Sequence, residues 1–427
     1  MNRAIQIAGL LFIQLVSLSS AAVQLRVGIY NCIPDIGQDN LTSYKGLIEG
    51  GFNNAAHTVD AVVDTTEYDP YGDLTTYLSE DGFDMIEMDT ANLKEVVEDD
   101  LIIDIPTNLP ENIMPAAVGA AAINGKLYAY PTLLCGNFLI GLVPPGNEQN
   151  CPLRNARVDY NAFYETMENC KQNVGGDWRR ILGGKMNDDY GWYLPYLYLD
   201  GYIDIHGRES VDKAVDEVMR GVVDPKVCER LSWYIGCCDD KTGQVGNKCY
   251  ENFIGSYVND SDNLYPDIIN GETAFYFGFS EKVAQVERDS DRNSYAAISG
   301  PLGEINNLLQ FTDALVINKA RWNAANDEKR NAIIDFVNYF LNNNLREDIA
   351  MGVDLNPPQV RYLLQSTETF YQNTTDLIYQ DLFWSLQRAV AAPSLTSYQK
   401  VTMEANLESL CIKFPQSKKM RKFKQEL

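Results

Sequence analysis

Histidine is nearly absent from this chain, which contains only two, His57 and His206, among 427 residues. Neither lies in a recognisable motif, so a serine or cysteine hydrolase with a histidine base finds no support unless one of them is recruited. The sequence also lacks a Walker motif and a GxGxxG segment, which leaves nucleotide chemistry without support. Internal repeats and low-complexity linkers are missing as well, so repeat architectures are excluded.

Basic residues are few relative to acidic ones. The chain has 35 lysines and arginines against 59 aspartates and glutamates, a formal net charge of -24. Such a surface repels phosphate backbones and anionic lipids, so we expect neither nucleic acid nor a membrane as a partner, and a cationic small molecule is better matched. A hydrophobic content of 45% over this length allows two or three ordinary domains.

Long apolar runs are missing except at the N-terminus. Arg3 is followed by an apolar stretch over 5–16 and by small residues over 17–22. That order is typical of a cleavable signal peptide, which we place at 1–22, and the run is shorter than the roughly 20 residues of a membrane span. The alternative is a buried N-terminal helix. The signal peptide predicts a secreted protein, either extracellular or in the lumen of a secretory or lysosomal compartment.

Nine cysteines and three glycosylation triplets, at Asn40, Asn259 and Asn373, agree with secretion. In an oxidising compartment we expect disulfides, and an odd count leaves a thiol to explain. The cluster from 170 to 249 is predicted to fasten loops. Zinc is the alternative, but this cluster has no paired CxxC and only His206 nearby. The cysteines are Cys32, Cys135, Cys151, Cys170, Cys228, Cys237, Cys238, Cys249 and Cys411.

The periodicity of apolar residues indicates where strands and helices lie. Residues 25–29 and 82–89 are predicted to be strands, with a helical segment between them. The clearest helix follows a cap at Asn326, because apolar residues from 333 to 341 recur at helical spacing, and it ends at 342–344. Further predictions are helices over 161–170 and 210–219, a turn and strand over 126–134, and short strands over 274–279 and 314–317.

This alternation predicts an α/β fold with parallel or mixed sheets flanked by helices. About 400 mature residues are enough for two lobes, and a ligand cleft is expected between them. We place the first lobe at 23–131 plus 283–345 and the second at 132–282 plus 346–412. The remaining segment, 413–427, carries six basic residues and is expected to be a solvated tail.

Cys135 is the candidate nucleophile. It follows a strand-like run and precedes Gly136, where a loop can open onto a cleft. A reactive thiol needs a base, and with so few histidines that base would be a carboxylate whose pKa is raised by burial. Glu281, at the end of the aromatic stretch 276–280, is the candidate base. The alternatives are that Cys135 is half of a disulfide and that Glu281 is an ordinary acid at the start of a helix.

Two further acids, Asp89 and Asp313, are placed at strand ends by the same patterns. If the sheets are parallel, both acids face the crevice at the carboxyl ends of the strands. Aromatic side chains would complete a box for a flat cationic ring, although each of them alone is compatible with a place in the core. Those aromatic residues are Tyr30, Tyr71, Trp192, Tyr196, Phe279 and Phe311.

Taken together, six segments resemble thiaminase I. Each is weak alone, but they follow the order of the family and cover most of residues 25–345. The resemblance implies the two-lobed fold of class II periplasmic binding proteins. The segments are IYNCIPD (29–35), FDMIEMDT (83–90), YPTLLCGNF (130–138), GWYLPYLYLDG (191–201), YFGFSE (276–281) and QFTDAL (310–315).

The resemblance implies a transferase of the thiamine pyridinylase type. Cys135 would match the nucleophile that attacks the pyrimidine of thiamine and expels the thiazole, and Glu281 the glutamate that activates it. An amine or thiol co-substrate would then accept the pyrimidine. Asp89 would match an aspartate that hydrogen-bonds the aminopyrimidine, and Asp313 one near the thiazolium, whose positive charge attracts carboxylates. Neither a cofactor nor a metal is implied, and we expect a monomer.

The resemblance also assigns aromatic residues to the substrate and explains the cysteine count. Cys32, Phe279 and Phe311 stand where the bacterial pattern has tyrosines. The two phenylalanines keep stacking but lose a hydroxyl hydrogen bond. An acid that the family carries between the second strand and the cysteine has no counterpart assigned here. Setting Cys135 aside leaves eight cysteines, enough for four disulfides. The aromatic residues assigned to the substrate are Tyr30, Tyr71, Trp192, Phe279 and Phe311.

Two other functions stay open. A non-catalytic extracellular binding protein for thiamine or another small cation would keep the acids and aromatics without needing a reactive Cys135 beside Glu281. A cysteine hydrolase unrelated to thiamine would require a histidine close to Cys135. The state and surroundings of this thiol therefore discriminate between the three functions.

Overall fold

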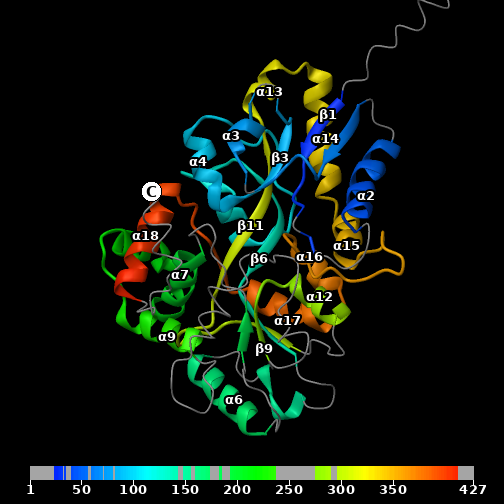
Figure 1. Ribbon diagram of the computed structural model, residues 1–427. Coiled ribbons are helices and arrows are strands. Elements are labelled where there is room, and N and C mark those ends of the chain that lie inside the picture. The colour runs from blue at the N-terminus through cyan, green and yellow to red at the C-terminus, as the bar shows by residue number, and fades with distance from the viewer. Residues whose placement is uncertain are drawn as a thin grey trace, which may run out of the picture.

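The structure, a computed structural model, has an α/β fold in which a larger and a smaller β-sheet lie one above the other (Figure 1). The predicted signal peptide and the basic tail lie outside the described residues, as do His57, Tyr71 and Trp192. The structure describes residues 24–31, 33–34, 40–55, 59–70, 72–79, 82–142, 148–154, 159–173, 182–184, 193–236, 275–289 and 296–411.

The larger sheet has seven strands in the order β12-β6-β11-β3-β1-β2, with β13 beside β11. Strand β1 pairs in parallel with both β2 and β3, whereas β11 runs antiparallel to β3 and to β6. The sheet is therefore mixed rather than parallel throughout. The strands are β1 (Gln24–Gly28), β2 (Asp60–Asp64), β3 (Met85–Asp89), β6 (Tyr130–Gly136), β11 (Leu308–Ile317), β12 (Leu364–Gln365) and β13 (Ala389–Ala391).

The smaller sheet has the order β10-β7-β9-β8. Strand β6 lies in the larger sheet, and the next strand, β7, lies in the smaller one. In the same way β10 lies in the smaller sheet and β11 in the larger one, so the chain crosses between the sheets twice. Strand β10 comes from the segment expected for the first lobe but lies in the smaller sheet, and β12 comes from the other segment but lies in the larger sheet. The strands are β7 (Phe138–Gly141), β8 (Leu182–Gly184), β9 (Phe275–Gly278) and β10 (Ala296–Ser299); β4 (Ala122–Ile123) and β5 (Lys126–Leu127) form a separate hairpin.

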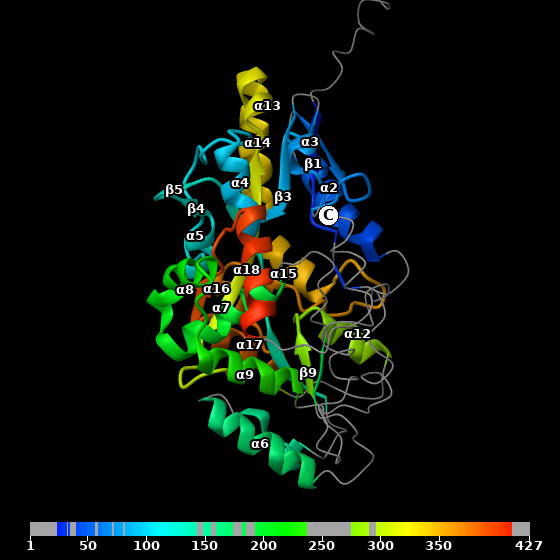
Figure 2. The ribbon, with the colours of Figure 1, turned by 60° about the vertical axis from the view of Figure 1, so that its left-hand side comes forward.

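Different helices flank the two sheets (Figures 1 and 2). Helices α2 and α14 pack beside β1 and β2, whereas α17 packs on β10, and α7 is surrounded by α8, α9 and α18. The helices are α2 (Asn40–Asn54), α3 (Leu74–Tyr77), α4 (Leu93–Glu98), α5 (Pro115–Ala120), α6 (Tyr160–Asn173), α7 (Tyr193–His206), α8 (Val211–Met219), α9 (Pro225–Gly236), α12 (Lys282–Asp289), α13 (Lys319–Ala324), α14 (Asp327–Phe340), α15 (Asn343–Met351), α16 (Glu368–Asn373), α17 (Leu377–Leu386) and α18 (Ser397–Leu410).

Most predicted elements are confirmed. Asn326 caps α14, because its side chain accepts a hydrogen bond from the Lys329 amide at 2.9 Å. Two strands differ from the prediction: β2 lies inside the stretch expected to be helical, and the strand expected over 314–317 is the end of β11, which begins at Leu308. The confirmed elements are β1 (predicted over 25–29), β3 (82–89), β6 (within 126–134), β9 (274–279), α6 (161–170) and α8 (210–219).

Each sheet is supported by its own buried apolar side chains. Phe52 of α2 and Phe336 of α14 lie edge to face, with ring centroids 5.2 Å apart, against the strands of the larger sheet. Phe275 and Phe277 of β9 are buried in another cluster together with α7 and α9. Burying side chains of this size contributes on the order of 2–3 kcal/mol each. The two sheets also share a core, because a further cluster joins Leu134 and Leu308 of the larger sheet to Phe138 of the smaller one.

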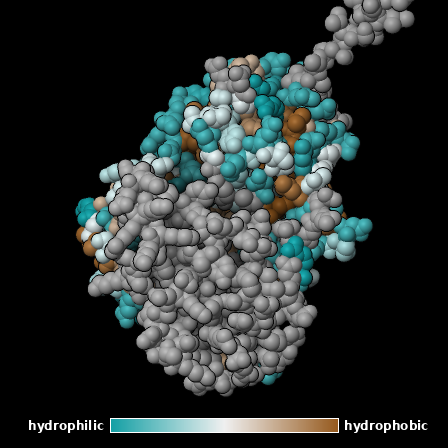
Figure 3. Space-filling view, in the orientation of Figure 1, coloured by the Kyte–Doolittle hydropathy of each residue, from teal (hydrophilic) through white to brown (hydrophobic). Residues whose placement is uncertain are grey.

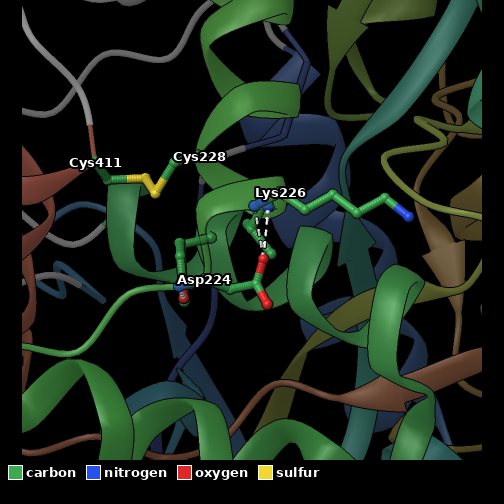
Figure 4. Close-up of a disulfide and its surroundings, with 6 residues drawn as sticks. Asp224, Lys226, Cys228 and Cys411 are labelled. Carbon is green, nitrogen blue, oxygen red and sulfur yellow. Dashed lines mark hydrogen bonds between the residues drawn. A yellow bond between two sulfur atoms is a disulfide. The ribbon is translucent and has the colours of Figure 1, made fainter.

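Disulfides fasten the helices of the smaller-sheet region, as predicted for the cysteine cluster. One bond ties the segment before α6 to α6 itself, and the other ties α9 to the residue after α18 (Figure 4). For Cys170 and Cys228 these bonds replace the zinc alternative. Cys32, Cys237, Cys238 and Cys249 lie outside the described residues. The disulfides are Cys151–Cys170 and Cys228–Cys411.

The described surface is mostly hydrophilic in Figure 3, and its apolar patches are bordered by polar residues. Within the described part of the chain, no helix is long and apolar enough to cross a membrane. The glycosylation triplet at Asn373 is exposed, whereas Asn40 is buried and its amide donates to the Pro34 carbonyl at 2.6 Å. Since a glycan must leave from a surface asparagine, the Asn40 triplet is a structural feature instead. Asn259 lies outside the described residues.

Candidate active site

Cys135 lies at the end of β6, where the chain leaves the larger sheet for β7 in the smaller one. It is not part of a disulfide, and its side chain is half-buried. The Cys135 thiol donates to Asp313 Oδ2 at a sulfur–oxygen distance of 3.9 Å. The next residue must be small, because a Cβ atom on Gly136 would come within 2.9 Å of Leu308 Cδ1. The disulfide alternative for Cys135 is therefore wrong.

The two predicted aspartates are brought together by strand pairing. Asp89 ends β3, as predicted, but Asp313 lies in the middle of β11 rather than at a strand end. Because β3 and β11 are antiparallel, the register places Asp313 directly opposite Asp89. Opposite residues of such a pair point to the same face with their Cβ atoms about 5 Å apart. The acids therefore meet through antiparallel pairing, not at the common edge of a parallel sheet.

Both aspartates are buried, and this shifts their protonation. Burial raises the pKa of Asp313 well above its ordinary value, and the carboxylates of Asp89, Glu87 and Glu281 raise it further. The hydrogen bond from the Cys135 thiol acts in the opposite direction and lowers this pKa. Burial also raises the pKa of Asp89, although the Ala91 amide, which donates to Asp89 Oδ1 at 2.8 Å, and Lys400 oppose the shift. An uncompensated pair of this kind holds protons at a pH where an exposed aspartate is ionised.

Glu281 reaches the site from the other sheet. It follows β9 in a turn that precedes α12, and its side chain is half-buried. Burial raises the pKa of Glu281, while the neighbouring Lys282 lowers it. Glu281 is one of the carboxylates whose charge raises the pKa of Asp313.

Aromatic residues flank the acids. Phe311, which pairs with Cys135 in the β-sheet register, is buried and meets the ring of Tyr196 edge to face at 5.0 Å. The Tyr196 hydroxyl donates to the Pro393 carbonyl at 3.1 Å. Burial raises the pKa of that hydroxyl, and the charge of the nearby Asp89 raises it further. Phe279 is half-buried against the same apolar cluster. Tyr71 and Trp192, also predicted for the site, lie outside the described residues.

The remaining predicted aromatic residue, Tyr30, lies beside the acids through its backbone. Its amide donates to Glu87 Oε2 at 3.0 Å. The structure thus gathers Cys135, Asp89, Asp313, Glu281 and Phe311 in one region, with Tyr30 attached through Glu87.

The sequence analysis missed a layer of polar residues beneath these side chains. Glu87 is fully buried, and Thr132 and Arg346, which pack near it, are buried as well. A signal for Glu87 was present, because an acid two residues before Asp89 shares its face of the strand. Arg346, and Lys400 of α18, which influences the pKa of Asp89, are far from the other site residues in the sequence. No local sequence pattern therefore indicates them. No metal-binding group of three or more His, Cys, Asp or Glu side chains occurs among the described residues.

Comparison with known proteins adds the fold family. No family model and no curated protein matches this sequence. Among solved structures, thiaminase I from Bacillus thiaminolyticus matches with a TM-score of 0.63 and 17% identity, covering 91% of this chain and 100% of its own. Clostridium botulinum thiaminase I in complex with thiamin matches with a TM-score of 0.58 and 17% identity over 90% of this chain and 99% of its own.

A binding protein matches with the same TM-score as the first of these structures. A chitin oligosaccharide binding protein has a TM-score of 0.63 and 13% identity over 91% of this chain and 94% of its own. At these identities the likeness concerns the fold, so the chemistry must be argued from the residues of the site. The chain has the two-lobed α/β fold that thiaminase I shares with the type II periplasmic binding proteins.

Proposed function

We propose that this chain is a secreted thiaminase I-type transferase that cleaves thiamine. The observation that supports this most strongly is the contact between the Cys135 thiol and Asp313 Oδ2, next to Asp89, in a protein with the thiaminase I fold. A binding protein for a cation needs the acids, but it does not need a thiol held against them. The two disulfides support an oxidising compartment.

In the proposed reaction, a carboxylate takes the proton of the Cys135 thiol, and the thiolate adds to the electron-poor pyrimidine. The bond between the pyrimidine unit and the thiazolium nitrogen breaks, and its electron pair stays on that nitrogen, which leaves a neutral thiazole. An amine or thiol co-substrate then forms a bond to the pyrimidine unit and displaces Cys135 as thiolate. No net oxidation or reduction occurs, so the reaction needs neither metal nor redox cofactor.

The acids divide the remaining roles. Glu281 is the proposed base, since burial raises its pKa toward the range in which a carboxylate can accept a thiol proton. Asp89 would hold the aminopyrimidine, and Asp313 would face the thiazolium while orienting the thiol. The aromatic residues proposed to line the substrate are Tyr30, Tyr71, Trp192, Phe279 and Phe311.

The test uses the secreted chain without its signal peptide, incubated with thiamine and either pyridine or aniline. We expect mass spectrometry to detect free thiazole and a pyrimidine adduct of the added amine, and to detect neither with Cys135→Ser. Adduct formation by the Cys135→Ser protein would refute the nucleophile. Absence of adduct with the unmodified chain, together with tight thiamine binding in calorimetry, would establish a binding protein instead.

A further inference from the structure

Glu87 lies beneath the candidate site and is fully buried. It precedes Asp89 by two residues on β3, so both side chains leave the same face of the sheet. One oxygen, Oε2, accepts the hydrogen bond from the Tyr30 amide at 3.0 Å. The other, Oε1, is hydrogen-bonded to the hydroxyl of Thr132. A carboxyl group placed this deeply needs a partner or a proton.

Thr132 connects Glu87 to the strand that carries Asp313. The register between β6 and β11 shifts at this point, since Asp313 pairs with Leu133 and Ala314 pairs with Pro131, which leaves Thr132 as the extra residue of a β-bulge. Pro131 has no N–H to donate to the opposite strand. Thr132 Oγ1 instead lies 2.8 Å from the Asp313 carbonyl oxygen, within hydrogen-bonding distance.

The number of hydrogens available to Thr132 and its two neighbours indicates which group carries the extra proton. The Thr132 hydroxyl holds one hydrogen but touches two acceptors, Glu87 Oε1 and the Asp313 carbonyl oxygen. A carbonyl can only accept, whereas a carboxyl group can also donate if it carries a proton. All three groups are satisfied when Glu87 donates to Thr132 and Thr132 donates to Asp313.

We propose that Glu87 is a neutral acid in the folded protein, and that Glu87 and Thr132 form a relay of two hydrogen bonds that positions Asp313 against the Cys135 thiol. Both are positioning residues, because neither is placed to touch a substrate. The role in catalysis rests on the proposed transferase function, whereas the protonation of Glu87 does not.

The charges around Glu87 agree with a neutral acid. Arg346 from α15 is the titratable group that acts on the pKa of Glu87. Glu87 in turn raises the pKa of Tyr44 from α2, Tyr68 from the segment after β2 and Asp313 from β11. Arg346 is the one cation among these four, and its hydrogen bonds go to Gln365 Oε1 at 2.8 Å and to the Thr132 carbonyl at 2.9 Å. No ion pair joins it to Glu87, although both residues belong to the described part of the chain. Burial raises the pKa of Glu87, and Arg346 and the two hydrogen bonds oppose that shift.

A neutral Glu87 also matters for the charge of the site. An ionised Glu87 would add a further negative charge beneath Asp313 and would make ionisation of Asp313 harder. With Glu87 neutral, Asp89, Asp313 and Glu281 remain to respond to a bound cation or to the thiol proton. The relay therefore fixes Asp313 in space while removing one competing charge.

Infrared spectroscopy tests the protonation directly. We expect the difference spectrum between the unmodified chain and Glu87→Gln at neutral pH to contain the carbonyl stretch of one neutral carboxylic acid. A difference spectrum with carboxylate bands instead would overturn the proposal. The Glu87→Gln amide keeps an oxygen for the Tyr30 amide and an N–H for Thr132, so the substitution preserves both hydrogen bonds if Glu87 is neutral.

Alkylation of Cys135 by iodoacetamide tests the relay without thiamine. We expect Thr132→Val, which removes the hydroxyl at constant shape, to lower the alkylation rate by about tenfold, the equivalent of one lost hydrogen bond. Thr132→Ser and Glu87→Gln should stay within about twofold of the unmodified chain. Equal rates for Thr132→Val and Thr132→Ser, or a tenfold change in Glu87→Gln, would overturn the proposal.

The two measurements separate this inference from the proposed function. If the unmodified chain does not cleave thiamine, the infrared and alkylation results still decide the state of Glu87. If it does cleave thiamine, the turnover of Thr132→Val should fall with its alkylation rate while that of Thr132→Ser is retained. The infrared result on Glu87→Gln also decides the matter if Thr132→Val fails to fold.

Discussion

Asp89 and Asp313 face each other across two adjacent antiparallel strands, both buried and both with a raised pKa. Two carboxylates at this distance in a low-dielectric environment do not ionise independently, so the pair keeps a proton that an exposed pair would lose. A bound cation changes this balance, because it stabilises the ionised form of each acid. The protonation of the pair therefore responds to a positive charge placed beside it.

Thiamine binding should release protons. Burial raises the pKa of both aspartates, and the thiazolium charge of bound thiamine should lower those pKa values again. We expect the binding heat measured by calorimetry to differ between buffers of unequal ionisation enthalpy. Asp313→Asn should reduce the difference, and a heat that is independent of the buffer would contradict the prediction.

Glu281→Gln should lower kcat by about 10²–10⁴, the usual effect of losing a general base, with little change in KM. Asp313→Asn should raise KM, because its proposed partner is the thiazolium charge, and should lower kcat less than Glu281→Gln does, because Asp313 also orients the thiol. Steady-state kinetics of both variants provide the measurement. A change below about threefold in Glu281→Gln, or a larger loss of kcat in Asp313→Asn, would transfer the role of base to Asp313.

Asp89→Asn should weaken recognition of the substrate and raise KM by about tenfold, the equivalent of one hydrogen bond to a charged group. The fold should tolerate the change, because an asparagine oxygen can still accept from the Ala91 amide. Kinetics and thermal unfolding on the same preparation separate the two effects. Unchanged KM and kcat would remove Asp89 from the site.

Stability should fall as the pH rises from about 4 toward 7 because of Asp200 and Asp204 on α7. Burial raises the pKa of Asp200 to about 7 and, together with Asp200, raises that of Asp204 well above its ordinary value. The folded chain then binds more protons than the unfolded chain from about pH 4 to pH 7, so this contribution is full at low pH and decreases by about 1.4 kcal/mol per pH unit and group.

Asp200→Asn should flatten that slope in denaturant unfolding measured between pH 5 and about 8. The hydrogen bond from the Leu309 amide to Asp200 Oδ1, 2.7 Å long, can be retained by the asparagine oxygen, whereas the other carboxyl oxygen has no partner to lose. An identical slope in the variant would show that Asp200 titrates normally.

Removing the Cys228–Cys411 disulfide should destabilise the chain more than removing Cys151–Cys170. The first bond closes a sequence separation of 183 residues and the second one of 19. In the loop-entropy model the two losses are about 5 and 3 kcal/mol, which a denaturant titration of the paired alanine variants can distinguish. A smaller effect for the longer loop would show that strain or residual structure dominates instead.

Local patterns in the sequence predicted much of the frame of this site. Asp89 was placed at the end of a strand, Cys135 was separated from the other cysteines by its context, and Asn326 was identified as a helix cap. These are properties of a few consecutive residues, and the structure confirms where each residue lies. The catalytic roles of Cys135 and Asp89 are still predictions.

The pairing of Asp313 with Asp89 could not be predicted in the same way. It depends on the direction and length of β11, which begins at Leu308 and runs antiparallel to β3 across a separation of more than two hundred residues. Glu87 was overlooked because a charged residue within a buried strand has meaning only once Thr132 is known to lie against it. Register and burial are long-range properties, and one sequence does not contain them in readable form.

The chain crosses between the two sheets twice, and the proposed nucleophile and base belong to different sheets. Cys135 ends β6 in the larger sheet, whereas Glu281 follows β9 in the smaller one. A rotation of one sheet relative to the other would therefore change the distance between Cys135 and Glu281. If these residues act as the proposed nucleophile and base, they meet in one angular setting of the sheets, and a ligand that stabilises this setting would bring the thiol and its activating group together.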